Sequence, residues 1–170
     1  TCSVKAGCAK VSWYWIGPDL DGDLTIPSDW NNVPDDAFTS CPVDVEDLNL
    51  RSKIQWIGNN AFKDQQIPKV TVPDSCTNIK SSSFQNNEEL KVLTCGSGLR
   101  YIGPSAFENC NVQNLNTNNV ITIGSKAFKK NDLKSITFGS ALEEIGEEVF
   151  ESCKLQNLNT NNVITIGSKA

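Results

Sequence analysis

The stretch that decides the fold is FENCNVQNLNTNNVITIGSKA (Phe107–Ala127), because the chain repeats it as FESCKLQNLNTNNVITIGSKA (Phe150–Ala170). The copies start 43 residues apart (150 − 107) and differ at three positions. Half of that distance falls within the periods of roughly 20 to 50 residues that are typical of stacked repeats. The duplication therefore indicates a repeat architecture.

The pattern Ile-Gly-x-x-Ala-Phe extends this period outward over most of the chain. A phenylalanine recurs every 21 to 24 residues, and we expect each one to lie in the core. These residues are Phe38, Phe62, Phe84, Phe107, Phe128 and Phe150. An aliphatic residue stands five positions before each, from Val33 to Ile145, and Ile166 occupies the same place in an unfinished last unit.

A short run of alternating residues precedes each phenylalanine, which predicts one strand per unit. The runs are 24–26, 48–50, 70–72, 93–95, 115–117, 136–138 and 158–160. A unit of about 22 residues cannot bury its apolar side alone, whereas stacked units cover one another and align their strands in a parallel sheet. The sequence predicts a solenoid.

Three units resemble the BspA-type leucine-rich repeat, also called the Treponema pallidum type: LKSITFGSALEEIGEEVFESC (Leu133–Cys153), LKVLTCGSGLRYIGPSAFENC (Leu90–Cys110) and LTIPSDWNNVPDDAFTSC (Leu24–Cys41). The resemblance implies a leucine-rich repeat solenoid, a right-handed superhelix of ~22-residue coils. A parallel β-sheet would form one face, with short strands, turns or 3₁₀ segments on the other. It also implies a secreted or cell-surface protein, since many family members serve adhesion or bind matrix proteins.

Two regions follow from the period. Residues 20–170 form an array of seven units, the last incomplete, and residues 1–19 fall outside the period and are expected to form an N-terminal cap. The chain starts without Met, and Ala170 stops one residue before the next expected phenylalanine, so we expect a piece of a longer protein.

The chain has seven cysteines, and a disulfide bond between two of them in the cap region would imply an oxidising compartment. Cys2 and Cys8 are the first candidates for a disulfide in the cap, and Cys8 with Cys41 is the second. Cys41, Cys110 and Cys153, each three residues after a phenylalanine, and Cys95, at an inward strand position, are interpreted as buried apolar thiols.

The residue inventory argues against catalysis and against several ligands. The chain has no histidine, so the usual general base and the Ser-His-Asp and Cys-His arrangements are impossible, and no enzyme and no cofactor are expected. A formal charge of −5 without a basic cluster argues against nucleic acid. No apolar run is long enough to span a membrane.

A row of polar residues on the sheet face is the main candidate binding site. The outward residue at the middle of each predicted strand is Thr or Asn, and stacking would place these residues about 4.8 Å apart from coil to coil. The row consists of Thr25, Asn49, Thr71, Thr94, Asn116, Thr137 and Asn159. It could bind a glycan or an extended peptide, although Thr and Asn also suit a solvated sheet. The flanking outward residues include Asn114 and Ser135.

Three smaller features of the sequence are further candidates for a site or a turn. Trp56 and Tyr101 are aromatic surface candidates, two coils apart with Asn78 between them. The carboxylates at 19, 21 and 23 could bind calcium, but the loop pattern that would complete such a site fails, so a polar turn and no metal site are favoured. Asn118–Asn119 is expected to be a turn in left-handed geometry.

We expect an extracellular module that binds a macromolecular partner, a protein or a glycan, or helps a cell adhere. The alternative is a structural subunit of a surface filament, coat or larger assembly, with other subunits as partners. A remote alternative is ice or glycan binding by the Thr/Asn sheet face.

Overall fold

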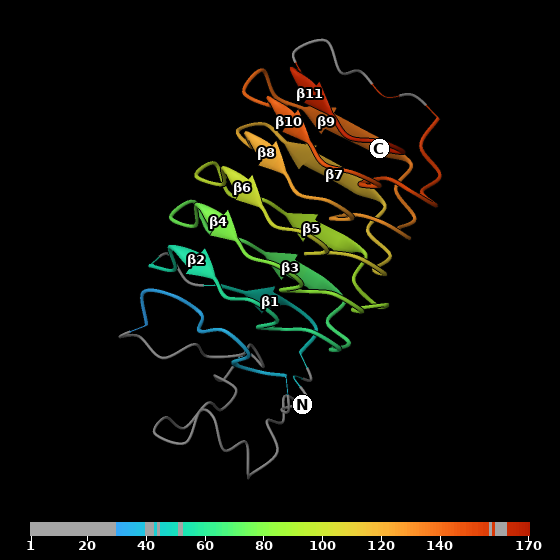
Figure 1. Ribbon diagram of the computed structural model, residues 1–170. Helices are drawn as coiled ribbons and strands as arrows, with labels where there is room; N and C mark the ends of the chain where they lie inside the picture. The colour runs from blue at the N-terminus through green and yellow to red at the C-terminus, as the bar shows by residue number, and fades with distance from the viewer. Residues whose placement is uncertain (1–29, 40–42, 44, 51–52, 157, 159–162) are drawn as a thin grey trace.

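The computed structural model describes residues 30–39, 43, 45–50, 53–156, 158 and 163–170. Within them the chain forms a solenoid whose coils each contribute one strand to each of two parallel sheets (Figure 1). The predicted cap, Cys2, Cys8, Cys41, Thr25, Asn159 and the possible calcium ligands at 19, 21 and 23 lie outside the described residues. The predicted solenoid is confirmed in the described part of the chain.

Sheet 1 has the order β1-β3-β5-β7-β9 and carries five of the seven predicted strands; the runs at 24–26 and 158–160 lie wholly or mainly outside the described residues. Its strands are β1 (Leu48–Asn49), β3 (Lys69–Thr71), β5 (Val92–Thr94), β7 (Asn114–Thr117) and β9 (Ser135–Phe138). Buried and outward residues alternate along each strand, because successive side chains point to opposite faces. Cys95 packs against the core as expected, but it is only partly buried and lies one residue beyond the end of β5 rather than in the strand.

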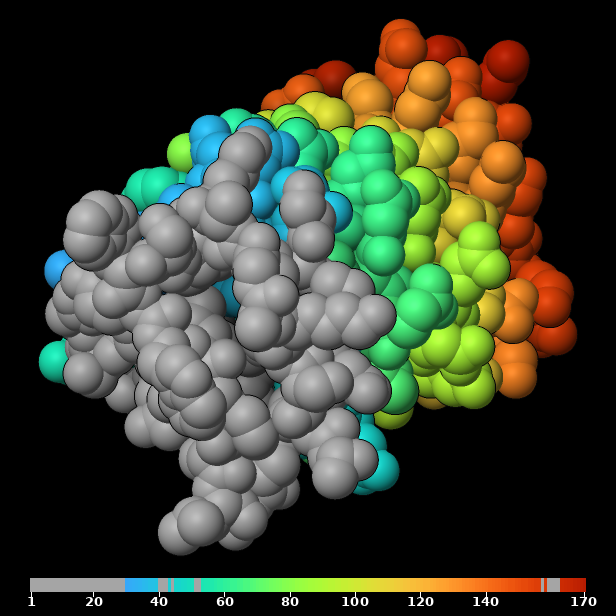
Figure 2. Space-filling model, turned by 90° about the horizontal axis from the view of Figure 1, so that it is seen from below, coloured from blue at the N-terminus to red at the C-terminus, as the bar shows by residue number. Residues whose placement is uncertain are grey.

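Sheet 2 consists of two-residue strands in the order β11-β10-β8-β6-β4-β2. They are β2 (Trp56–Ile57), β4 (Asn78–Ile79), β6 (Tyr101–Ile102), β8 (Thr122–Ile123), β10 (Glu144–Ile145) and β11 (Thr165–Ile166). The isoleucines of the repeat pattern stand opposite one another from coil to coil, and those of β2 to β10 are buried. The colours of Figure 2 run in sequence through the stack, one coil behind the next.

A column of phenylalanine rings runs through the core. Phe38, Phe62, Phe84, Phe107 and Phe128 are fully buried, and neighbouring rings stack with centroids 4.8 to 5.4 Å apart. The step from Phe128 to Phe150 widens to 6.4 Å. Because every ring is covered by those above and below, the column holds consecutive coils in register.

A buried polar ladder satisfies the backbone beside this column. From Phe62 onward, the position three residues after each phenylalanine of the column holds Gln65, Asn87, Cys110, Asn131 and Cys153. The Nδ2 group of Asn131 donates hydrogen bonds to the carbonyls of Phe128, at 3.0 Å, and of Phe107 in the preceding coil, at 2.7 Å. Its Oδ1 atom accepts the N–H of Val112 at 3.1 Å. One side chain therefore satisfies three buried backbone groups.

The two described cysteines of the ladder make a related contact. The Cys110 and Cys153 thiols donate to the carbonyls of Phe84 and Phe128, at 3.2 and 3.1 Å. Burial raises the pKa of the Cys110 thiol to about 12 and also raises that of Cys153. Both remain protonated donors at neutral pH, so they are hydrogen-bonding residues of the ladder and not simply apolar thiols.

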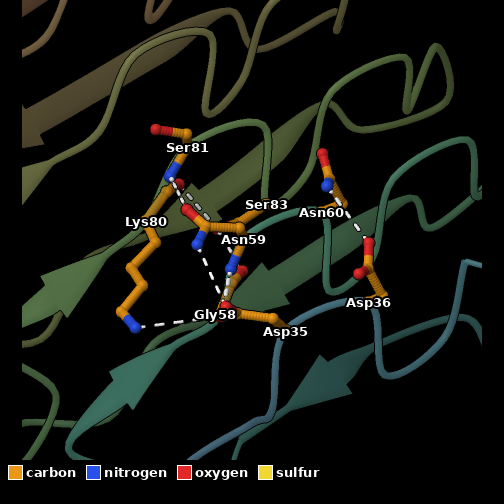
Figure 3. A network of polar contacts seen from close by, with 8 residues as sticks. All are labelled: Asp35, Asp36, Gly58, Asn59, Asn60, Lys80, Ser81 and Ser83. Carbon is orange, nitrogen blue, oxygen red and sulfur yellow. Dashed lines mark hydrogen bonds and ion pairs between the residues drawn. The ribbon is translucent and has the colours of Figure 1, made fainter.

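The corners of the coils carry a second, exposed set of polar contacts (Figure 3). Asp35 accepts the backbone N–H of Asn59 at 2.8 Å and its side-chain amide at 3.1 Å. Asn60 donates to Asp36 at 3.1 Å. These contacts join the corner at residues 35–36 to the corner of the next coil.

The left-handed backbone positions lie at these corners rather than at Asn118–Asn119. They stand two residues before or after a phenylalanine or its expected position, at Asp36, Asn60, Asp64, Ser82, Asn86, Ser105, Asn109, Lys126, Lys130, Glu148, Ser152 and Lys169. Asn118 and Asn119 do form a turn, but neither has a positive φ, so the left-handed expectation was wrong.

The ladder predicts a specific loss of stability. Asn131→Ala is expected to lower the free energy of unfolding by about 1 to 3 kcal/mol, because it removes the side-chain partner of the buried Phe107 carbonyl and Val112 N–H, whereas the Phe128 carbonyl keeps the Cys153 thiol. Denaturant titration measures the change. The control Asn119→Ala removes an exposed amide and should stay within about 0.5 kcal/mol. Equal losses in the two variants would contradict the role of the ladder.

Candidate binding groove on sheet 1

The predicted polar row lies on the outer face of sheet 1. Asn49, Thr94, Asn116 and Thr137 are exposed and Thr71 is half-buried. The register places Asn49, Thr71 and Thr94 opposite one another, and likewise Asn116 opposite Thr137. The row therefore has two aligned parts: one on β1, β3 and β5, and the other on β7 and β9. The boundary between them lies between β5 and β7.

The ladder of sheet 1 is interrupted at that point. Between β5 and β7 the register consists of Val92 opposite Asn114 alone, whereas β3–β5 has three pairs and β7–β9 has four. The equivalent bonds elsewhere run from the N–H of Leu50 to Thr71 and from that of Val72 to Thr94. The N–H of Cys95, which would continue this series to Asn116, makes no backbone hydrogen bond in the described part of the chain.

A difference in turn length explains the interruption. Val72 and Ile79 are seven positions apart, as are Cys95 and Ile102, but Thr117 and Ile123 are only six apart. The shorter turn after β7 follows the next coil: a Cβ on Gly139 would lie 1.7 Å from the carbonyl oxygen of Asn118.

The turn after β5 packs against the preceding coil instead. A Cβ on Gly96 would lie 2.4 Å from the backbone of Pro73 in the preceding coil. The two turns therefore separate at the end of the sheet, and only residues without a Cβ permit these close approaches.

A groove of about 570 Å³ lies along this gap. Its lining is mainly hydroxyl, amide and backbone groups, with a few aliphatic side chains at its base. The lining residues used below are Asp74, Thr94, Cys95, Ser97, Asn114, Asn116, Ser135 and Thr137. Three of them, Thr94, Asn116 and Thr137, belong to the row that the sequence singled out.

The hydrogen bonds inside the groove orient its side chains. Asn116 Oδ1 accepts the N–H of Asn118 at 3.1 Å, and Asn114 Oδ1 accepts the hydroxyl of Ser135 at 2.7 Å. Neither amide nitrogen has a partner among the described residues, so both are available as donors to a ligand.

Asp74 supplies the carboxylate of the groove. Its Oδ1 accepts the backbone N–H of Ser97 at 2.6 Å and the Ser97 hydroxyl at 3.0 Å. The backbone bond, with the hydroxyl bond second, lowers the pKa of the Asp74 carboxyl. Sequence reasoning missed Asp74 and Ser97, because only the close packing of the two turns brings them to the groove.

The half-buried Cys95 thiol also lines the groove. Burial raises its pKa to about 12, so it stays protonated and is not a nucleophile at neutral pH. Cys76, Cys95, Cys110 and Cys153 are all free thiols in the structure.

The aromatic candidates lie elsewhere. Trp56 and Tyr101 flank Asn78 on sheet 2, and both are half-buried. Lys80 places its Nζ 4.0 Å from the centroid of the Trp56 ring. The same Nζ lies 3.8 Å from Asp35 Oδ1 (Figure 3). The lysine therefore covers one face of the Trp56 ring, and neither aromatic lines the groove.

The described residues contain neither a metal cluster nor a membrane-spanning helix. Across the described ranges, no group of three His, Cys, Asp or Glu side chains could hold a metal ion. The described part of the chain likewise holds no helix of the length and apolarity needed to cross a bilayer.

Comparison with known proteins gives a family. The model of the "BspA type Leucine rich repeat region" matches residues 22–122 and 117–170 in six copies. The chain is also similar to the crystal structure of a leucine-rich repeat protein from Bacteroides ovatus ATCC 8483, with 15% identity and a TM-score of 0.39. That match covers 84% of this chain and 68% of the other. No curated protein sequence matches the chain.

The interruption predicts fast exchange of one backbone amide. The Cys95 N–H has no acceptor among the described residues and Cys95 lines the groove, whereas the Val72 N–H donates to Thr94 at 2.9 Å. Hydrogen exchange followed by NMR should therefore be at least about tenfold faster at Cys95. Comparable protection of the two amides would show that the ladder is continuous.

Proposed function

Because the chain belongs to the BspA-type leucine-rich repeat family, we propose that it is a non-catalytic binding module that recognises a macromolecular partner through sheet 1. The observation that carries the proposal is the coincidence of the groove with Thr94, Asn116 and Thr137. Members of this family are often surface proteins, and we place this chain outside the cell or on its surface, where its partner would be a protein or glycan encountered in adhesion.

The rigidity of the coils favours this role. The groove side chains stand on strands whose inner residues, Leu93 and Leu115, are buried. A site built on packed strands loses little conformational entropy when a partner binds, so more of the contact energy remains as affinity.

The chemistry of the face also favours binding over simple solvation. A groove excludes water from part of a ligand, which a flat row of Thr and Asn does not. Its donors and acceptors are mainly neutral, so a partner does not have to desolvate many opposing charges.

The proposal is tested with a triple variant of sheet 1, Thr71→Lys, Thr94→Lys and Thr137→Lys. These three side chains make no hydrogen bond within the described residues, so the fold should survive. The probes are immobilised extracellular-matrix proteins and a glycan array, read by biolayer interferometry and fluorescence. We expect saturable binding to at least one probe, and a loss of about tenfold or more in the variant.

The matched control carries the same added charge on sheet 2: Asn78→Lys, Thr122→Lys and Thr165→Lys. It should bind as the unmodified chain does. Equal binding by the sheet 1 and sheet 2 variants would show that sheet 1 is not the binding surface. Assembly into fibres at rising concentration, with no saturable ligand, would instead support the structural-subunit alternative.

A further inference from the structure

We propose, building on the proposed function, that the groove between β5 and β7 binds an extended polypeptide segment whose lysine or arginine side chain pairs with Asp74. The ligand class is argued from the spacing of the donors, the composition of the lining and the place of the single carboxylate.

The spacing of the donors matches an extended main chain. Asn114 and Asn116 stand two residues apart on β7, which separates their amide nitrogens by roughly 6.6 Å if the side chains are parallel. Carbonyl groups on one edge of an extended peptide repeat at the same interval. A peptide lying along β7 could therefore accept a hydrogen bond from both amides.

The opposite side of the groove offers complementary groups. The N–H of Cys95 lacks the acceptor that its equivalents have, and the Thr94 hydroxyl can donate or accept. A peptide carbonyl placed at the gap could accept the hydrogen bond of the Cys95 N–H, which has no acceptor among the described residues. This is the way in which extended peptides add to open sheet edges, here confined to one interruption.

The lining favours a peptide over a sugar. No aromatic side chain stands among the described residues that line the groove, so a sugar ring would find no flat apolar surface on which to stack. The aliphatic residues of the lining, such as Leu93 and Leu115, are buried beneath the strands, so the groove offers a partner mainly amide, hydroxyl and main-chain groups, which suit the backbone of a peptide.

The carboxylate fixes the charge of the partner. Among the described residues that line the groove, Asp74 is the only Asp, Glu, Lys or Arg. The Cys95 thiol also lines the groove but stays protonated at neutral pH. Both of its hydrogen bonds are accepted by Oδ1, so Oδ2 is free of partners within the described residues. A carboxylate held in place in this way is suited to an ammonium or guanidinium group.

The test uses a fluorescent positional-scanning library of N-acetylated, C-amidated octapeptides, with a glycan array in parallel. The unmodified chain should bind library members saturably and prefer Lys or Arg at one position. Asp74→Asn keeps an acceptor for Ser97 but loses the charge, so it should lose that preference and about tenfold in affinity for the selected peptides.

The matched control is Asp35→Asn. Asp35 also accepts the backbone N–H of the following coil, and its pKa is likewise lowered chiefly by that bond, but it lies at a corner outside the groove. This variant should keep the preference. Thermal unfolding of both variants checks that the fold is retained.

The outcomes separate this inference from the proposed function. Saturable glycan binding without peptide binding would overturn the peptide assignment and leave a binding module in place. Peptide binding with an unchanged Lys or Arg preference in Asp74→Asn would overturn the pairing with Asp74. Binding to no peptide, glycan or matrix protein would overturn both proposals.

Discussion

The stacked phenylalanine column is the interaction on which the rest of the structure depends. Each coil has an apolar side that only a neighbouring coil can cover, and the rings from Phe38 to Phe128 lie nearly parallel at 4.8 to 5.4 Å. The buried ladder that contains Asn87 and Asn131 completes this arrangement by satisfying the carbonyls of the phenylalanines themselves. Packing and hydrogen bonding thus fix the same register from coil to coil.

Because the core fixes the register of the coils, a binding site can arise only from the outward side chains and from differences in coil length. The groove uses both. The single residue missing between Thr117 and Ile123 cannot be absorbed in the core, because Ile123 and the phenylalanines must stay in line. The difference therefore appears at the surface, where the turns after β5 and β7 separate and expose polar side chains and an unpaired N–H.

The sequence predicts the scaffold well and the site only in part, for physical reasons. The period of Phe and Ile follows from the need to bury apolar residues, and the strands of sheet 1 lie within about one residue of the predicted runs in the described part. Thr94 and Asn116 could be placed on the outer face from alternation alone. Asp74 could not, because its place depends on how Gly96 packs against the coil before it. The shorter turn after β7 can be recognised in the sequence. Its packing against the next coil, through Gly139, could not be predicted because it depends on contacts between coils.

The central claim is that turn length opens the groove, and lengthening that turn tests it most directly. Inserting one glycine between Asn118 and Asn119 restores the seven-residue spacing found in the neighbouring coils. Amide exchange of Cys95 in this variant should slow to the level of Val72, as its N–H gains an acceptor on Asn116. An exchange rate that stays as fast as in the unmodified chain, in a variant that is still folded, would contradict the account.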